Sequence, residues 1–400
     1  MQLFGSRKNG KHKGSSPIHS DADMGDTIET DSFDSTAGEE IAHPRSSKEP
    51  SPPPKKKKTN KALKIIGIVF LIILILVAVA VAYWHFTTKP PDVAGPSPTA
   101  TAAPENSAQP VDGANGGNRY YTLLLVGKDA IGANTDTIML LRYDTVEHKV
   151  NVYSIPRDTL VDVPHSVKKI NSVYFQKKNG KQGGIDALMD EVKNICGFRP
   201  NNYAVVDINI VAEVIDALGG VDFDVPVNMN YDDPSPHQDL HIHINKGMQH
   251  LSGENAVKVF RFRSTYAMGD IDRLNVQHDL LKACVKQWIT IGNIDKLFAA
   301  GKIVTENAET DLTYGNIQWY AQEFLRLNSD DITFATMPGN YSLTYHGGSY
   351  VGIDVDAWLK IVNEQLNPTD KTIDKKDCRI VYQTNGSFAV TDGSVFGSPD

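Results

Sequence analysis

Three short stretches near the middle of the chain decide the fold: Tyr121-Thr-Leu-Leu-Leu-Val126, Thr137-Ile-Met-Leu-Leu-Arg142 and Lys149-Val-Asn-Val-Tyr-Ser154. Each is an apolar or alternating run bounded by Gly, Asp or Pro, which is typical of a β-strand. Three such runs in close succession predict the start of a β-sheet with short connections between its strands.

The segments that follow alternate between helical and extended patterns. Gly184–Ile195 places its apolar residues at helical spacing, whereas Tyr203–Ile208 is strand-like. Further helices are predicted over residues 210–218, 251–260, 270–291 and 313–327, and a further strand over residues 221–227. Because strands and helices intermix throughout residues 120–366, we predict one α/β domain in three α/β/α layers, with a central mixed β-sheet.

Three segments precede this domain. Residues 1–62 are rich in Ser, Pro, Gly, Lys and Asp, so they cannot bury enough apolar surface to fold, and we expect a disordered cytoplasmic tail. Ile65–Trp84 carries no charge and is long enough to cross a hydrocarbon core of about 30 Å, which predicts a transmembrane helix over residues 63–84. Residues 85–119 have the composition of an extracellular linker.

Flanking charge predicts the orientation of this helix in the cell membrane. Lysines dominate the preceding side, whereas only Lys89 follows closely, so the N-terminus is expected in the cytoplasm and the domain outside. The preceding lysines are Lys55, Lys56, Lys57, Lys58, Lys61 and Lys64. A cleaved signal peptide is the alternative, because Ala78-Val-Ala80 resembles a cleavage site; the long N-terminal segment favours a retained single-pass anchor.

The C-terminal tail, residues 367–400, contains a hairpin signal. Asn385-Gly386 separates two short alternating runs, which predicts a β-hairpin with a two-residue turn. Two strands alone are marginal in water, so this hairpin must dock on the domain or stay mobile. The three cysteines, Cys196, Cys284 and Cys378, lack metal-ligand spacing and leave one disulfide with an odd thiol open.

An arginine-rich stretch points to anion chemistry: Arg261-Phe-Arg263-Ser-Thr-Tyr-Ala-Met-Gly-Asp270-Ile-Asp-Arg273-Leu-Asn-Val-Gln277. On a helix that begins at Asp270, Arg273 and Gln277 share one face, and Arg261 and Arg263 share a side if the chain there is extended. Guanidinium forks match phosphate oxygens two at a time, which predicts a diphosphate site. A solvated helix face with surface ion pairs is the alternative.

Other side chains are predicted to join this stretch. Asp129 follows the first strand and Asp136 opens the second, so the two carboxylates could share a hard cation, although turn chemistry also explains Asp at strand ends. Arg157 follows the third strand in Ser154-Ile-Pro-Arg157-Asp158-Thr. A net charge of −8 argues against a nucleic-acid partner.

The order of these motifs resembles the LytR-CpsA-Psr family. The matching motifs are L-L-L-x-G-x-D at 123–129, D-T-I-M-L at 136–140, S-I-P-R-D-T at 154–159, K-I-N at 169–171, D-A-L-G-G-V-D at 216–222, L-S-G-E-N-A at 251–256, R-x-R at 261–263 and G-D-x-x-R-x-x-x-Q at 269–277. The resemblance implies an extracytoplasmic phosphotransferase that moves a glycopolymer from a polyprenyl-diphosphate carrier to peptidoglycan, with Mg²⁺ or Mn²⁺, and that hydrolyses diphosphates.

The resemblance also assigns roles to residues. It implies that the catalytic residues are Arg157, Arg261, Arg263, Arg273 and Asp270. The substrate-binding residues would be Gln277, Lys169 and Asn171, and the metal ligands Asp129 and Asp136. Asn134 and Val276 stand where the family often has Arg, and Lys128 or Lys169 could compensate for the missing charge.

Two further functions stay open from the sequence. One is a non-catalytic membrane-bound regulator, since the predicted layout also suits a sensor, and the other is a lipid-diphosphate binding module that only hydrolyses. His241 and His243 share one face of a predicted strand, and this pattern is more typical of a polar strand face than of a transition-metal site.

Overall fold

The structure is a computed structural model that describes residues 71–78, 88–92, 111–113, 117–128, 135–178, 181–233, 240–262, 270–289 and 294–397. Of the predicted transmembrane segment, residues 71–78 belong to this set and are helical. Within these ranges, no helix combines the length and the apolar composition needed to cross a membrane. Asp129, Asn134 and Arg263 lie outside the described residues, as does the side chain of Asp270.

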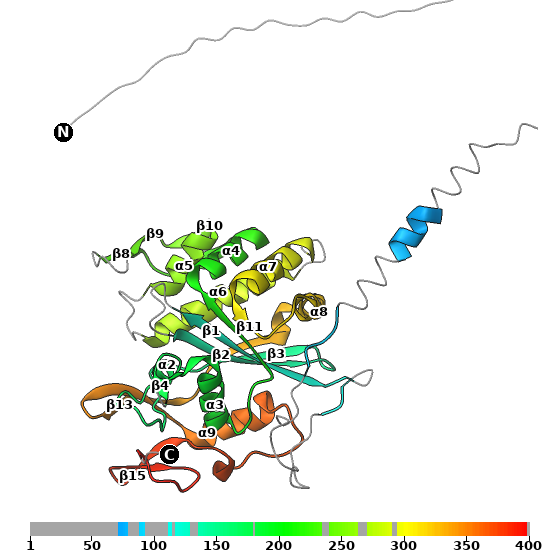
Figure 1. Ribbon diagram of the computed structural model, residues 1–400. Coiled ribbons are helices and arrows are strands. Elements are labelled where there is room, and N and C mark those ends of the chain that lie inside the picture. Colours follow the sequence, from blue (N-terminus) through cyan, green and yellow to red (C-terminus); the bar gives the residue numbers. More distant parts are fainter. Residues whose placement is uncertain are drawn as a thin grey trace, which may run out of the picture. The chain divides into compact units, whose positions relative to one another are not determined.

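In the described part of the chain, the central sheet has six strands in the order β11-β6-β1-β2-β3-β12 (Figure 1). Their bounds are Tyr120–Lys128 (β1), Thr135–Asp144 (β2), Lys149–Ser154 (β3), Asn202–Asp207 (β6), Glu309–Thr310 (β11) and Ile332–Thr336 (β12). Strands β1, β2 and β3 pair antiparallel, whereas β6 joins β1 and β12 joins β3 in parallel. The sheet is therefore mixed, as the sequence predicts.

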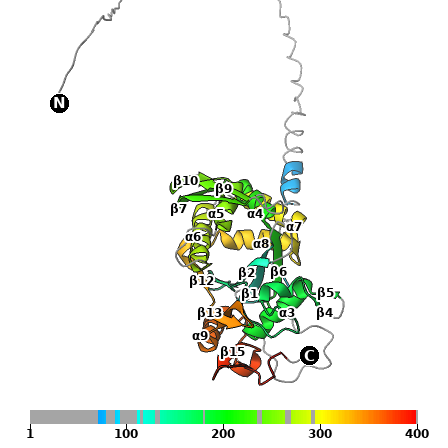
Figure 2. The same ribbon diagram turned by 90° about the vertical axis from the view of Figure 1, so that its left-hand side faces the viewer.

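Both faces of this sheet carry apolar side chains. Helices cover both faces (Figures 1 and 2). On one face, Leu124 and Leu140 pack with residues of α3 (Gly184–Cys196) and α9 (Val355–Ile361). On the other, Met139 and Tyr143 pack with residues of α6 (Asp270–Trp288) and α8 (Tyr314–Phe324). Since successive side chains of a strand point to opposite faces, these alternating contacts give the three predicted α/β/α layers.

A second, smaller core lies beside the sheet. It is built from α4 (Ile208–Leu218), β7 (Val221–Val225), β8 (Met229–Asp233), β9 (Leu240–Ile244), β10 (Gly247–Leu251) and α5 (Gly253–Arg261). Helix α7 (Ile294–Asn307) contacts both α4 and α8. Strands β7 and β9 alternate strictly between buried and exposed residues. Each therefore packs one face inward and presents the other to solvent.

Several shorter elements complete this part of the fold. They are α2 (Ile170–Val173), β4 (Lys177–Lys178), β5 (Lys181–Gln182), β13 (Gly339–Tyr345), β14 (Gly348–Ile353), and short helical turns over Ser329–Asp331, Val362–Leu366 and Lys375–Asp377. Strands β13 and β14 form a hairpin. The backbone of Val351 in β14 bonds to Asp158 and Leu160, which fixes the loop after β3 against this hairpin.

The C-terminal tail docks on the domain. Strands β15 (Val381–Thr384) and β16 (Ser387–Val390) form a hairpin, and Asn385 and Gly386 between them have positive φ, as a tight hairpin turn requires. Val381 and Phe388 pack in a cluster with Leu160. Upstream, Ile380 is fully buried in the main core. All three cysteines are free and buried, so the disulfide left open by the sequence is not formed.

Candidate functional site

A narrow pocket lies where the start of β2, the loop after β3 and the first turns of α6 meet. Its lining includes Asp136, Arg157, Arg273 and Gln277. The volume within which the centre of a water molecule can move is about 20 Å³, which is room for about one water. Four residues predicted from three separate motifs are thus brought to one place. Their convergence depends on the sheet, because β2 and β3 are paired neighbours.

An ion pair forms one wall of this pocket. The Nη1 of Arg157 donates a hydrogen bond of 2.6 Å to Oδ1 of Asp136, and its Nε lies 3.7 Å from Oδ2 of Asp158. The Arg157 side chain is 22% exposed and that of Asp136 is 35% exposed. In this half-buried setting water screens the charges less than at a free surface, so the pair holds the guanidinium fork beside the pocket.

Helix α6 supplies another part of the pocket lining. Arg273 and Gln277 are both buried and stand one turn apart, as the predicted helix requires. The Nε2 of Gln277 donates a hydrogen bond of 2.9 Å to the carbonyl of Phe260, near the end of α5. This bond ties the pocket side of α6 to the segment that leads into the arginine-rich stretch.

Arg261 departs from the arrangement considered from the sequence. An extended chain would place it on the same side as Arg263, but Arg261 is the last residue of helix α5. It is not among the described residues that line the pocket. The next residue, Phe262, is extended and almost fully buried, so the helix ends where this aromatic ring enters the second core.

Lys169 and Asn171 hold the Arg157 loop from outside the pocket lining. The Nζ of Lys169 lies 2.8 Å from Oδ1 of Asp158 and sits over the ring of Tyr350. The backbone N–H of Asn171 donates to the carbonyl of Arg157, and the Asn171 carbonyl accepts a bond from the hydroxyl of Thr135. The K-I-N motif therefore connects the Arg157 loop to the first residue of β2.

Two features of the site are not indicated by any sequence motif. Tyr341 lines the pocket and also a neighbouring open cavity of about 500 Å³, which shares Leu274 with it. Ser154 and His278 are buried, and Oγ and Nε2 share a hydrogen bond of 2.9 Å that joins β3 to α6. Ser154 belongs to the S-I-P-R-D-T motif, but only the fold shows its histidine partner.

The buried histidine predicts a pH dependence of stability. Burial lowers the pKa of His278 below its ordinary value of 6.5, and Lys282 lowers it further against a smaller opposing effect of Asp279. Below pH 6.5 the unfolded chain therefore binds a proton at His278 more readily than the folded protein does. The free energy of unfolding consequently falls as the pH falls. Replacing His278 with Gln is expected to flatten this fall below pH 6.5.

The measurement is urea-induced unfolding as a function of pH. His250→Gln is the matched control, because the side chain of His250 is 58% exposed. An equally steep pH dependence in His278→Gln and in the native protein would show that the buried ring is not its source.

The comparisons with known proteins bear on the same region. A family model described as the LytR_cpsA_psr family matches residues 96–367, which include the pocket and the whole central sheet. The chain belongs to this family. The resemblance inferred from the order of the motifs is thereby confirmed.

Relatives of this LytR-CpsA-Psr protein carry several names. TagV of Bacillus subtilis, a polyisoprenyl-teichoic acid–peptidoglycan teichoic acid transferase, is 31% identical over 183 residues, 44% of this chain and 45% of TagV. The cell wall biosynthesis protein LcpA of Corynebacterium glutamicum is 29% identical over 278 residues, 62% of this chain and 51% of LcpA. The regulatory protein MsrR of Staphylococcus aureus is 27% identical over 221 residues, 54% of this chain and 64% of MsrR.

The fold of this LytR-CpsA-Psr protein is that of a solved relative. The crystal structure of Bacillus subtilis TagV matches with a TM-score of 0.51 and 26% identity, covering 62% of this chain and 98% of that chain. The chain spans less than two thirds of the length of the three curated relatives named above. These relatives are named for teichoic acid transfer, for cell wall biosynthesis and for regulation.

Proposed function

We propose that this protein is a phosphotransferase that moves a glycopolymer from a polyprenyl-diphosphate carrier to peptidoglycan. In this reaction an acceptor hydroxyl attacks the phosphorus that carries the glycopolymer, the bridging P–O bond breaks, polyprenyl phosphate leaves and the hydroxyl proton is released. The observation that carries the proposal is the convergence of Arg157, Arg273, Gln277 and Asp136 on one pocket within the family-matched region.

The chemistry of these side chains suits phosphoryl transfer. The reaction needs little covalent help from a protein, but it needs positioning and neutralisation of charge on the phosphate oxygens. The two guanidinium groups that line the pocket, those of Arg157 and Arg273, can supply this charge, and the amide of Gln277 is already oriented by the Phe260 carbonyl. The acceptor hydroxyl is the nucleophile, so no protein nucleophile is required.

The donor set also fits a hard cation. Two carboxylates, Asp136 and Asp158, line the described pocket, and Mg²⁺ is commonly held by one or two carboxylates together with substrate phosphates. Mg²⁺ or Mn²⁺ would be held here by Asp136, with the predicted ligand Asp129 outside the described residues, and would neutralise phosphate charge. The guanidinium of Arg157 is also a positive partner of Asp136.

The proposal places the domain outside the cell, anchored to the membrane by the helix predicted over residues 63–84. Support comes from the lysine-rich flank before that segment, because positive charge is retained on the cytoplasmic side. Protease added to intact cells should then remove the 120–366 domain and leave the N-terminal tail protected. Degradation of the tail alone would contradict this orientation.

The test of function is a transfer assay with the purified full chain. With Mg²⁺, a polyprenyl-diphosphate-linked saccharide and a peptidoglycan fragment, we expect the saccharide phosphate to appear on the fragment, and chelation of the metal to suppress its appearance. Release of the saccharide phosphate into water, without transfer, would instead favour the hydrolase. An inert protein across several donors would count against both.

The second candidate is a non-catalytic regulator of envelope processes. It is favoured by the relationship to MsrR, which is named as a regulatory protein. A regulator would bind the lipid diphosphate without consuming it, so saturable binding together with an inactive transfer assay would support this alternative.

A further inference from the structure

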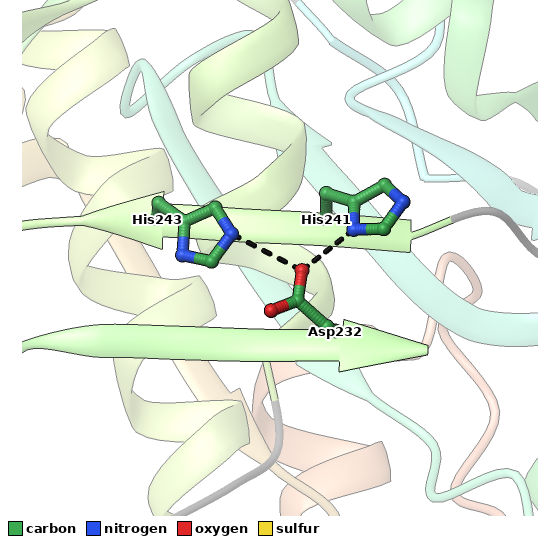
Figure 3. A group of neighbouring side chains, drawn as sticks. All are labelled: Asp232, His241 and His243. Atoms are coloured by element: carbon green, nitrogen blue, oxygen red, sulfur yellow. Dashed lines mark hydrogen bonds and ion pairs between the residues drawn. The ribbon is translucent and has the colours of Figure 1, made fainter. Parts of the chain in front are cut away.

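A cluster of one carboxylate and two imidazoles lies on the outer face of the β8–β9 hairpin (Figure 3). The Oδ1 of Asp232 lies 2.6 Å from Nδ1 of His241 and 3.1 Å from Nε2 of His243. One ligand atom from each side chain can be chosen so that all three lie within 4.8 Å of one another. The strands β8 and β9 that carry the cluster also supply buried residues to the smaller core. None of the three residues lines the pocket that contains Arg157 and Arg273.

The hairpin fixes this arrangement from its buried side. Asp232 pairs directly with His241 across the two strands, and His243 is two residues further along the same face. The intervening Ile242 is fully buried in the second core, as is Met229 of the opposite strand. Because the inward side chains set the register, the three outward side chains cannot slip relative to one another.

We propose that Asp232, His241 and His243 bind a late first-row transition-metal ion, with Zn²⁺ as the representative. Two imidazole nitrogens and one carboxylate oxygen form a ligand set that zinc takes in open sites, where water completes the coordination. Nitrogen ligands favour such ions over Mg²⁺ and Ca²⁺, which prefer oxygen. The metal would replace the protons that the two rings now share with Asp232.

The accessibility of the three side chains fits an open site. Asp232, His241 and His243 are 55%, 56% and 60% exposed, so an ion can reach them without opening the core. A bound ion would cross-link β8 to β9 on the face that the core does not hold.

The same subdomain contains a matched control. Across the β7–β10 pair, Nδ1 of His250 lies 2.7 Å from Oδ1 of Asp222, and the two side chains are 58% and 65% exposed. This pair resembles the proposed site in its exposure and in its carboxylate–imidazole contact. It is not part of the group of three potential ligands that the described residues contain. An ordinary polar strand face would give both places the same weak affinity for metal.

The experiment is a Zn²⁺ titration of the purified full chain in competition with a chromophoric chelator. We expect one Zn²⁺ per chain, a Kd raised about tenfold or more by His243→Ala and by His241→Ala, and a Kd unchanged within about twofold in His250→Ala. Co²⁺ in place of Zn²⁺ should give ligand-field absorption that His243→Ala abolishes and His250→Ala retains.

Two results would overturn the proposal. One is native binding no tighter than that of a variant carrying Asp232→Asn, His241→Ala and His243→Ala together. The other is a loss of Zn²⁺ affinity in His250→Ala equal to that in His243→Ala. The metal would then bind exposed histidines without preference for the proposed site. Equal melting temperatures of the metal-free proteins check that these exposed substitutions leave the fold intact.

Discussion

Replacing Arg157 with Ala is expected to lower the rate of saccharide phosphate transfer by about a hundredfold or more. The guanidinium sits beside the pocket, 2.6 Å from Asp136, and its loss removes positive charge from the place where phosphate oxygens gain negative charge. Steady-state rates at saturating donor measure the effect. Arg157→Lys should recover part of the rate, because the ammonium keeps the charge but not the two-pronged geometry.

The control for this substitution is Arg199→Ala. Arg199 also pairs with two aspartates, Asp186 and Asp190, but on an exposed surface away from the pocket lining. Its replacement should leave the rate within about twofold, since exposed ion pairs contribute little. If Arg157→Ala transfers as fast as Arg199→Ala, the pocket is not where the reaction occurs.

Replacing Trp358 with Ala is expected to lower the free energy of unfolding by about 3–5 kcal/mol. Trp358 is fully buried between α9 and the sheet, packs edge-on against Tyr153, and donates a hydrogen bond of 2.8 Å from Nε1 to the carbonyl of Ile195. The substitution leaves a large cavity in the main core and removes the donor for a buried carbonyl. Urea-induced unfolding measures the change.

Trp358→Phe separates these two contributions. Phenylalanine keeps most of the apolar volume but cannot donate to Ile195, so the expected loss is about 1–3 kcal/mol. A loss below about 1 kcal/mol in Trp358→Ala would mean that α9 is not a structural part of the main core.

The part of the fold that depends on local periodicity could be predicted from sequence. Strands β1 to β3 are short apolar runs joined by tight connections, and their neighbours in the sheet follow from their order. The pairing of β12 with β3 could not be predicted, because these strands are far apart in the chain. Helix α7 is not predicted from the sequence, because Gly301 disfavours a helix in its interior. The packing of the two helices explains this glycine: a Cβ at position 301 would lie only 2.6 Å from the side chain of Ile317 in α8.

The site could be predicted where each motif supplies a side chain directly. Asp136, Arg157, Arg273 and Gln277 line one pocket because strand pairing and one helical turn bring them there. The position of Arg261 at the end of α5 depends on burial of Phe262, a tertiary effect. The hydrogen bond between Ser154 and His278 also joins segments that are distant in the sequence, so no local sequence pattern predicts it.

The segment that follows residue 367 completes the main core. Residues after 367 lie beyond the family match, yet Cys378 and Ile380 pack in the main core with α3, and the Arg379 backbone bonds to Asn194 at the end of that helix. Without these residues, the apolar side of α3 would stay partly open to water. A chain shortened before residue 378 would therefore expose an apolar surface prone to aggregation.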